Sequence, residues 1–322
     1  MKAVYVPNYY ASFRCIASKC RHSCCVGWEI DVDEEALSRF DRVSGTMGER
    51  LRLSIDREAD PPCFRLDEQE RCPFLNENGL CDLITELGED ALCQICADHP
   101  RFRNVLYDRV ELGLGLCCEA AAELILSQRE PFSLVELPLH EAARERAACA
   151  RTDDPDPIID GLLNAREAIL AVIQDRASPL AERIRHVQTS LDIHLPMNTY
   201  AEWAAFLTDL ERLDPAWDSV LWALSGCSDD PARELEGETS TAYEQLTVYF
   251  LYRYLASEDD GRLALLQVRT AFAVMATALI HAIVKTTCLP VDEIARMFSS
   301  EIEYSEENLE RFLDLLEDGQ IS

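Results

Sequence analysis

Cysteine is the residue type whose number and spacing point most directly to chemistry in this chain. The stretch CIASKCRHSCCVGW, residues 15–28, places four cysteines within eleven positions, and eleven of the fourteen cysteines lie in the first 118 residues. Thiolates are soft ligands that suit zinc, copper(I) and iron–sulfur clusters. A disulfide scaffold would be a shorter, exported chain, whereas MKAVYVPNYYASFRC contains no continuous apolar run. The cysteines therefore predict a metal-binding module in a cytoplasmic protein.

The spacing of these cysteines differs from the common metal-binding motifs. Zinc fingers pair two Cys-x-x-Cys units, and here we find one such unit, Cys93 to Cys96. The order Cys20-x3-Cys24, followed at once by Cys25, also differs from the Cys-x3-Cys-x2-Cys motif of radical enzymes. Adjacent cysteines do not easily ligate one ion together, so each can serve a different site, or one can ligate while the other packs. Spacing alone leaves zinc and iron–sulfur as alternatives.

Short helices and turns are expected to position the cysteines, and longer helices follow them. In the first part of the chain we expect helices over residues 31–42, over 81–96 with an interruption at Gly88, and from residue 117 to 130. From residue 131 onward, apolar residues recur every three or four positions, with prolines between the segments. The periodic segments are residues 155–177, 179–195, 198–213, 242–257, 262–287 and 305–318.

We find no alternating apolar–polar pattern long enough to predict a strand. The sequence therefore predicts a mainly α chain in two parts. Residues 1–130 form a cysteine-rich, loop-rich metal-binding module, held by metal–thiolate bonds more than by a large core. Residues 131–322 form an all-α helical domain.

The net charge of −29 restricts the partners of the chain. Such a surface repels phosphate groups, so we expect no nucleic-acid binding. The most apolar segment, residues 263–284, is about long enough to cross a bilayer but contains Gln267, Arg269 and His281. A charge in the middle of a membrane costs a few kcal/mol or more. We therefore expect a buried helix of a soluble domain and no membrane insertion.

Four blocks of the first part, taken in order, resemble the flagellin lysine-N-methylase family. They are VPNYYASFRCIASKCRHSCCVGWEIDVD, CPFLNENGLCDLITELGED, CADHPRF and CCEAAAELIL, and they lie within residues 4–126. The same layout is similar to a wider group of zinc- or iron-chelating cysteine clusters. The helical part resembles the family in length and character, without a motif.

The resemblance implies a set of eight metal ligands. The family pattern falls on Cys15, Cys20, Cys24, Cys25, Cys72, Cys81, Cys96 and Cys117. Eight thiols are enough for two four-thiolate sites, or for one cluster with spares. Cys63, Cys93 and Cys118 lie outside the pattern. Because the family more often has proline at 118, the assignment between the two neighbours 117 and 118 stays open. His99 stands in place of a family tyrosine, either as a ligand or as a hydrogen-bonded loop residue.

The resemblance also implies an activity. It implies an iron–sulfur protein, with a [4Fe–4S] cluster, that uses S-adenosylmethionine to methylate surface lysines of flagellin. The residues show no Gly-x-Gly-x-x-Gly after a strand, so no Rossmann-type donor site is visible. A carboxylate or a tyrosine near the cluster would help to deprotonate lysine, but none of the 59 acidic residues is singled out. Four tyrosines are expected on a core helix, with one or two of their hydroxyls reaching its edge: Tyr243, Tyr249, Tyr252 and Tyr254.

Two functions of other classes compete with this one. The first is a non-enzymatic zinc or iron–sulfur module whose helices bind a partner. The second is a redox-sensing or electron-transfer iron–sulfur protein, since paired thiols can be oxidised reversibly. Binding of the methyl donor and methylation of flagellin distinguish the enzyme from both.

Overall fold

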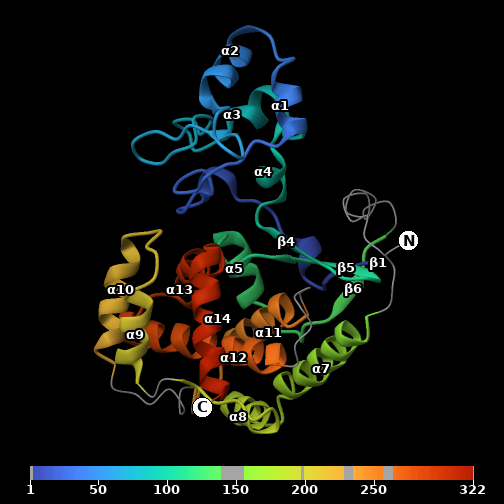
Figure 1. Cartoon of the computed structure of the whole chain (residues 1–322), viewed down its shortest axis with the longest axis vertical. Helices are drawn as coiled ribbons and strands as arrows, with labels where there is room; N and C mark the ends of the chain where they lie inside the picture. Colours follow the sequence, from blue (N-terminus) through green and yellow to red (C-terminus); the bar gives the residue numbers. More distant parts are fainter. Residues whose placement is uncertain (1–2, 139–155, 197–198, 228–234, 257–263, 322) are drawn as a thin grey trace. The chain divides into compact units, whose positions relative to one another are not determined.

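A computed structural model describes residues 3–138, 156–196, 199–227, 235–256 and 264–321 of the chain, which forms two compact units (Figure 1). The cysteine-rich unit comprises residues 14–102 and 118–120. The helical unit comprises residues 1–13, 103–117 and 121–322. The division expected at residue 130 follows composition, whereas contacts place residues 103–117 with the helices.

The helical unit consists mainly of α-helices, and each of the six periodic segments contains one. The fold is therefore mainly α, as the sequence predicts. The helices are α5 (Glu119–Leu126), α7 (Pro157–Ile173), α8 (Leu180–Ser190), α9 (Tyr200–Thr208), α10 (Ala216–Ser225), α11 (Thr241–Tyr254), α12 (Ala264–Thr287), α13 (Val291–Phe298) and α14 (Glu306–Ile321), with the π-helix η5 (Ser299–Glu303) between the last two.

A four-stranded sheet, which we did not expect from the sequence, lies in the same unit. Its strands are β1 (Ala3–Pro7), β4 (Arg101–Val105), β5 (Arg109–Leu114) and β6 (Leu134–Glu136), in the order β4-β5-β1-β6. Strand β1 pairs in parallel with β5 and antiparallel with β6. The expectation of no strand was wrong because β5 is buried at five consecutive positions, which leaves no alternating pattern.

Helix α12 is the core helix of this unit. Its residues Leu266–Thr287 are long and apolar enough to cross a membrane, but 89% of that window is buried inside the structure. It packs against α10, α11, α13 and α14. Burial of this kind is typical of the core helix of a soluble protein, as expected for the segment.

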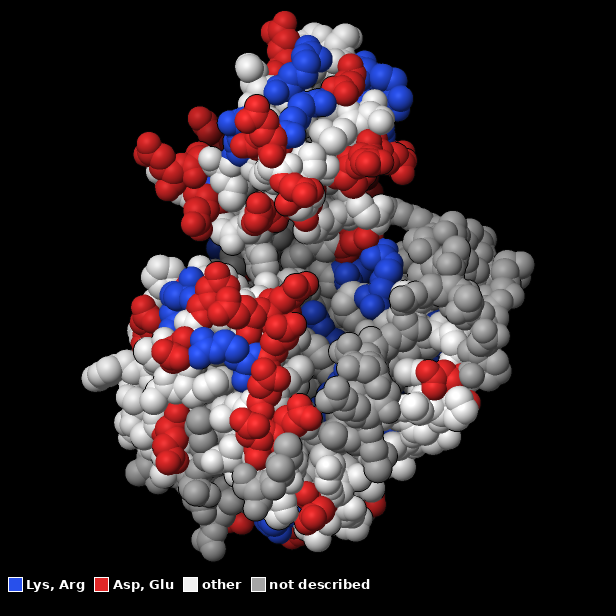
Figure 2. Space-filling model, in the orientation of Figure 1, with Lys and Arg blue, Asp and Glu red and all other residues white. Residues whose placement is uncertain are grey.

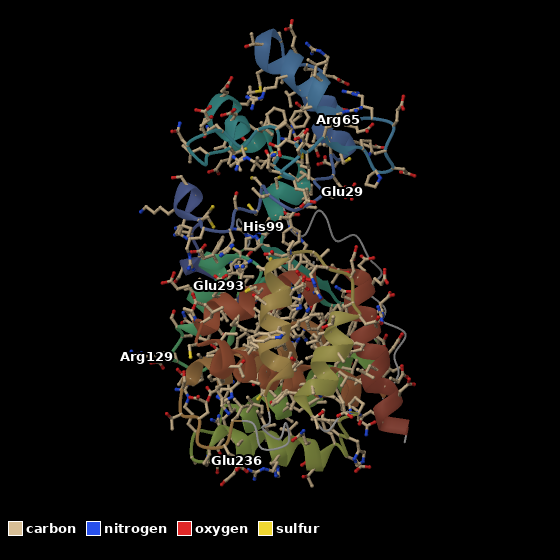
Figure 3. All side chains as sticks on the ribbon, turned by 90° about the vertical axis from the view of Figure 1, so that its left-hand side faces the viewer. Glu29, Arg65, His99, Arg129, Glu236 and Glu293 are labelled. Atoms are coloured by element: carbon tan, nitrogen blue, oxygen red, sulfur yellow. The ribbon has the colours of Figure 1, made fainter. Side chains whose placement is uncertain are left out.

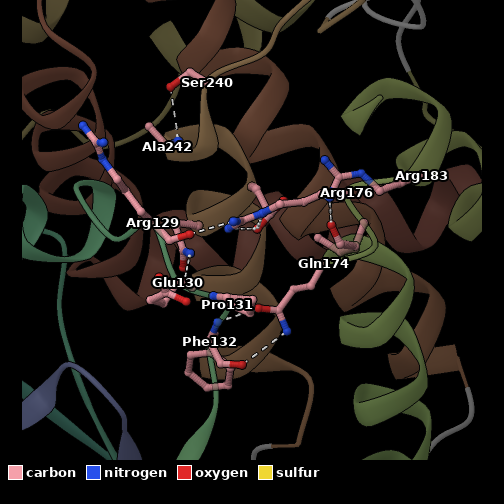
Figure 4. Close-up of polar contacts among 12 residues, drawn as sticks. Arg129, Glu130, Pro131, Phe132, Gln174, Arg176, Arg183, Ser240 and Ala242 are labelled. Atoms are coloured by element: carbon pink, nitrogen blue, oxygen red, sulfur yellow. Dashed lines mark hydrogen bonds and ion pairs between the residues drawn. The ribbon is translucent and has the colours of Figure 1, made fainter. Parts of the chain in front are cut away.

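Buried ion pairs join the helices to the sheet and to one another. Arg166 of α7 makes two 2.7 Å bonds to Glu111 of β5, with side chains 3% and 0% exposed. Glu244 of α11 accepts bonds from Arg176 over 2.8 Å and from Arg183 over 2.7 Å. Arg176 also donates to the backbone carbonyl of Arg129, in the segment between α5 and β6. Figure 4 shows this bond and the polar contacts around it. These ion pairs hold α7, α8 and α11 in place relative to one another and to β5.

The cysteine-rich unit is built from short elements around a small aromatic core. Its elements are α1 (Glu34–Phe40), α2 (Gly45–Ser54), β2 (Ile55–Asp56), β3 (Cys63–Phe64), α3 (Asp82–Leu87), η3 (Glu89–Ala91) and α4 (Gln94–Asp98). The helix predicted over 31–42 and the interruption predicted at Gly88 are confirmed, while α2 was not predicted. The rings of Phe40, Phe64 and Phe74 pack at centroid distances of 5.0 and 6.2 Å.

Candidate metal centre

Four cysteines of the cysteine-rich unit lie within electrostatic reach of one another and beside its aromatic core. We call them the second thiol group: Cys25, Cys72, Cys81 and Cys96. Burial, together with the charges of the other three thiols, raises the pKa of Cys72 to about 12. The backbone carbonyl of Cys25 accepts the Cys72 amide over 2.8 Å, which holds two members together. Such a set favours a positive ion, because metal binding removes the thiolate repulsion.

Four other cysteines form a separate set in the same unit. We call them the first thiol group: Cys15, Cys20, Cys24 and Cys118. Burial, together with the charges of nearby Glu119 and Cys118, raises the pKa of Cys20 to about 11. Arg21 fixes this arrangement, since its backbone amide and its side-chain Nε both donate to the Glu119 carboxylate over 2.9 Å. The segment around Cys20 is thereby tied to the start of α5, where Cys118 lies.

Cys24 and Cys25 are adjacent in the chain but belong to different groups. Their thiols share a hydrogen bond, which lowers the pKa of Cys25 to about 7 and raises that of Cys24. The Ser23 hydroxyl and the charge of Arg71 also lower the pKa of Cys25. The pair can therefore serve two sites, which is one of the two roles expected for adjacent cysteines.

Cys117 and Cys118 are also split, and this bears on the predicted ligands. Cys117 is buried in the helical unit, where its thiol hydrogen-bonds with Tyr304. Cys118 belongs to the cysteine-rich unit and its charge acts on Cys20 and Cys24. Seven of the eight predicted ligands thus fall in the two groups. The eighth, Cys117, does not, and its neighbour Cys118 lies in the first thiol group instead. The only signal for it in the sequence was the doubled cysteine itself.

Three further candidates lie outside the two groups. Cys93 is buried and hydrogen-bonds with Cys96, so it neighbours the second thiol group. Cys63 lies among carboxylates, and burial and the charge of Glu29 raise its pKa. His99 lies between α4 and β4 (Figure 3), and burial, aided by Arg101, lowers its pKa to about 4. The imidazole is neutral at pH 7, the form that can accept a hydrogen bond or ligate a metal.

The geometry of the thiols can be compared with what each metal centre needs. Among the residues that the structure describes, no three Cys, His, Asp or Glu side chains converge tightly enough to hold a metal ion. A [4Fe–4S] cluster keeps its four thiolates farther apart than a single ion does, because iron and sulfide fill the space between them. Each thiol group offers the four cysteines that such a cluster takes. In residue type, four cysteines suit a four-thiolate zinc site as well as a [4Fe–4S] cluster.

Comparison with known proteins gives similarity to lysine methylases. The chain is 28% identical over 144 residues to the lysine-N-methylases of Salmonella typhimurium and Salmonella choleraesuis, covering 42% of this chain and 36% of each of those proteins. It is 27% identical over 144 residues to the flagellar biosynthetic protein FliU of Salmonella muenchen, covering 42% of this chain and 85% of that protein. The match thus spans about a third of the length of the lysine-N-methylases.

The chain was also compared with protein-family models and with solved structures. No family model matches the chain. No solved structure matches it. The resemblance to flagellin lysine-N-methylases seen in the sequence is confirmed as a similarity to proteins of that name.

Proposed function

We propose that this chain is a cytoplasmic protein-lysine N-methyltransferase that uses S-adenosylmethionine and methylates flagellin. The observation that carries the proposal is the 144-residue match to proteins named lysine-N-methylase. The name of a third relative refers to flagellar biosynthesis, which supports a flagellar substrate. The two competing functions, a binding module and a redox protein, draw support from the thiols alone.

We further propose that each thiol group holds one [4Fe–4S] cluster. Four thiols in each group supply the full ligand set, and the apolar core beside the second group would shield its cluster from water. A bound cluster would supply a cross-link between distant segments and a redox centre. In the first group, Arg21 and Glu119 would keep two ligand-bearing segments together.

The proposed reaction needs a lysine that has lost its proton. The neutral amine attacks the methyl carbon of the sulfonium donor, and the thioether leaves. Asp and Glu side chains are spread over the visible face of each unit (Figure 2), as the net charge of −29 requires. Such a surface attracts the lysine-bearing face of a substrate protein.

Purification without oxygen, followed by metal analysis and a methylation assay, tests the proposal. We expect iron and acid-labile sulfide in equal amounts, with the broad visible absorption of sulfide-to-iron charge transfer. Incubation with S-adenosylmethionine should add methyl groups to flagellin lysines, as detected by mass spectrometry of its peptides. Zinc in place of iron would refute the cluster. A metal-loaded protein that binds no methyl donor would favour the binding module, and a reversible potential without methyl transfer would favour the redox protein.

A further inference from the structure

Glu303 is a buried carboxylate at the centre of a hydrogen-bonded set of side chains in the helical unit. Its side chain is 0% exposed. The Tyr249 hydroxyl donates to it over 3.0 Å, and the Tyr254 hydroxyl donates over 2.8 Å. The Arg253 guanidinium lies 3.3 Å away and also donates to the Tyr249 hydroxyl over 2.7 Å. Three partners from one helix, α11, thus hold a single carboxylate.

An uncommon backbone conformation brings Glu303 to these partners. Glu303 is the last residue of η5, a π-helix that follows α13. π-helical turns are rare, and they occur frequently at functional sites. In the same turn, buried Glu301 accepts the backbone amide of Leu213 over 3.2 Å. The turn is therefore anchored to other parts of the unit as well as to α11.

The Arg253 guanidinium is an internal cation that packs against two aromatic rings. Its carbon Cζ lies 5.3 Å from the ring centre of Tyr254 and 5.1 Å from that of Tyr304. Both distances are within the range of about 6 Å for cation–π attraction. We call Tyr254, Tyr304 and Glu303 the cation seat. Aromatic rings of this kind also bind alkylated ammonium groups, including methyl-lysine.

The cation seat differs from an ordinary internal ion pair. Arg253 is 12% exposed at its side chain, and Tyr254 and Tyr304 are only partly buried, so the cation seat lies near the surface of the unit. The pair of Arg166 and Glu111 is closed, at 3% and 0%. A buried ion pair is weak evidence for stability, because apolar replacements are often neutral or stabilising.

We propose that the cation seat binds the side-chain ammonium of the substrate lysine, in the place that Arg253 fills in the free chain. This inference rests on the proposed methyltransferase function. The lysine ammonium gives one proton to the Glu303 carboxylate. Its nitrogen lone pair then forms a bond to the methyl carbon of the sulfonium donor, the sulfur–carbon bond breaks, and the thioether leaves with that electron pair. The methylammonium product keeps the positive charge, and the proton on Glu303 passes to water.

Chemical rescue of an emptied seat tests the binding step without any methyl transfer. In the full chain, Arg253→Ala removes the occupant and lowers the melting temperature. We expect n-butylammonium, which mimics the lysine side chain, to raise the melting temperature of this variant more than sodium chloride at equal ionic strength does. Arg166→Ala is the matched control, because its closed pair should show no specific rescue. Absence of rescue in Arg253→Ala, or equal rescue in both variants, overturns the seat.

The same assay separates the two cations of the reaction. Trimethylsulfonium mimics the reacting group of the methyl donor. A weaker effect of trimethylsulfonium than of n-butylammonium supports the lysine assignment. A stronger effect assigns the seat to the methyl donor and overturns our proposal.

Kinetics of two tyrosine variants test the seat if Arg253→Ala does not fold. Tyr304→Leu removes a ring, and we expect it to raise the KM for a lysine peptide about tenfold through loss of a cation–π contact. Tyr304→Phe keeps the ring and should restore most of the affinity. Equal KM values for Tyr304→Leu and the wild type overturn the seat. If the wild type transfers no methyl group, the proposed function fails, whereas peptide binding by the same variants still decides whether the seat exists.

Discussion

Serine replacements at Cys117 and Cys118 should give opposite results, although the two residues are neighbours. Cys118→Ser removes one of the four thiols of the first group, and a serine hydroxyl is a poor ligand for a soft metal centre. Cys117→Ser removes a thiol that hydrogen-bonds with Tyr304 in the helical unit. The ligand set of both thiol groups is intact in that variant.

The expected amounts follow from the two thiol groups. One [4Fe–4S] cluster in each group gives about eight iron atoms and eight sulfides per chain. Cys118→Ser should lower both to about four and should lower the melting temperature, because structural thiolate sites contribute folding free energy. Cys117→Ser should keep about eight iron atoms and should cost about 1 kcal/mol, the usual value of one hydrogen bond.

Iron and sulfide analysis of oxygen-free preparations, with differential scanning fluorimetry, measures both effects. Cys72→Ser is the control for the second thiol group and should also lose half of the iron. Equal iron contents in Cys117→Ser and Cys118→Ser would refute the separation of the neighbours. A wild type with about four iron atoms, all lost in Cys118→Ser and Cys72→Ser alike, would mean that one cluster draws on both groups.

Three further predictions concern single side chains. Glu244→Gln should lower the free energy of unfolding by about 3–5 kcal/mol, because it leaves Arg183 with a buried, uncompensated charge, and a urea titration showing a change below about 1 kcal/mol would contradict this. Asp33→Ala removes the cap of α1 and a 2.7 Å bond to α4, so hydrogen exchange should accelerate in those two helices and not throughout the unit. The pKa of His99 is lowered from 6.5 to about 4, so the folded chain binds fewer protons than the unfolded chain in that window. Stability should therefore fall as pH drops from 6.5 to 4, and His99→Gln should show a smaller slope.

Helices were predictable from the sequence, and the strands were not. The helices could be predicted because residues three or four apart share one helix face. A helix with one buried face therefore shows apolar residues at that spacing in its sequence. Helices α10 and α13, of 10 and 8 residues, are too short to establish such a period on their own. Strand β1 pairs with β5 across about a hundred residues, and that pairing depends on the whole unit. No local pattern carries this information.

The candidate site was predictable in residue type and only partly in detail. The cysteine framework stands out by composition, and seven of its expected members fall in the two thiol groups. Of the eight thiols in the two groups, seven lie outside helices, in turns and loops whose side-chain directions no periodic pattern fixes. Glu303 could not be chosen among 59 acidic residues, because its role comes from a π-helical turn and from partners on α11.

In each pair of adjacent cysteines, the two members belong to different groups or units of the chain. At Cys24–Cys25 the chain moves from the first thiol group to the second, and at Cys117–Cys118 it moves from the helical unit to the first thiol group. The Cys24 and Cys25 thiols hydrogen-bond with each other, so the two groups meet at this pair. Beyond that bond, Cys24 interacts with Cys15 and Cys118, whereas Cys25 interacts with Cys72, Cys81 and Cys96. When the two members of each pair are assigned separately, the first and second thiol groups contain four cysteines each.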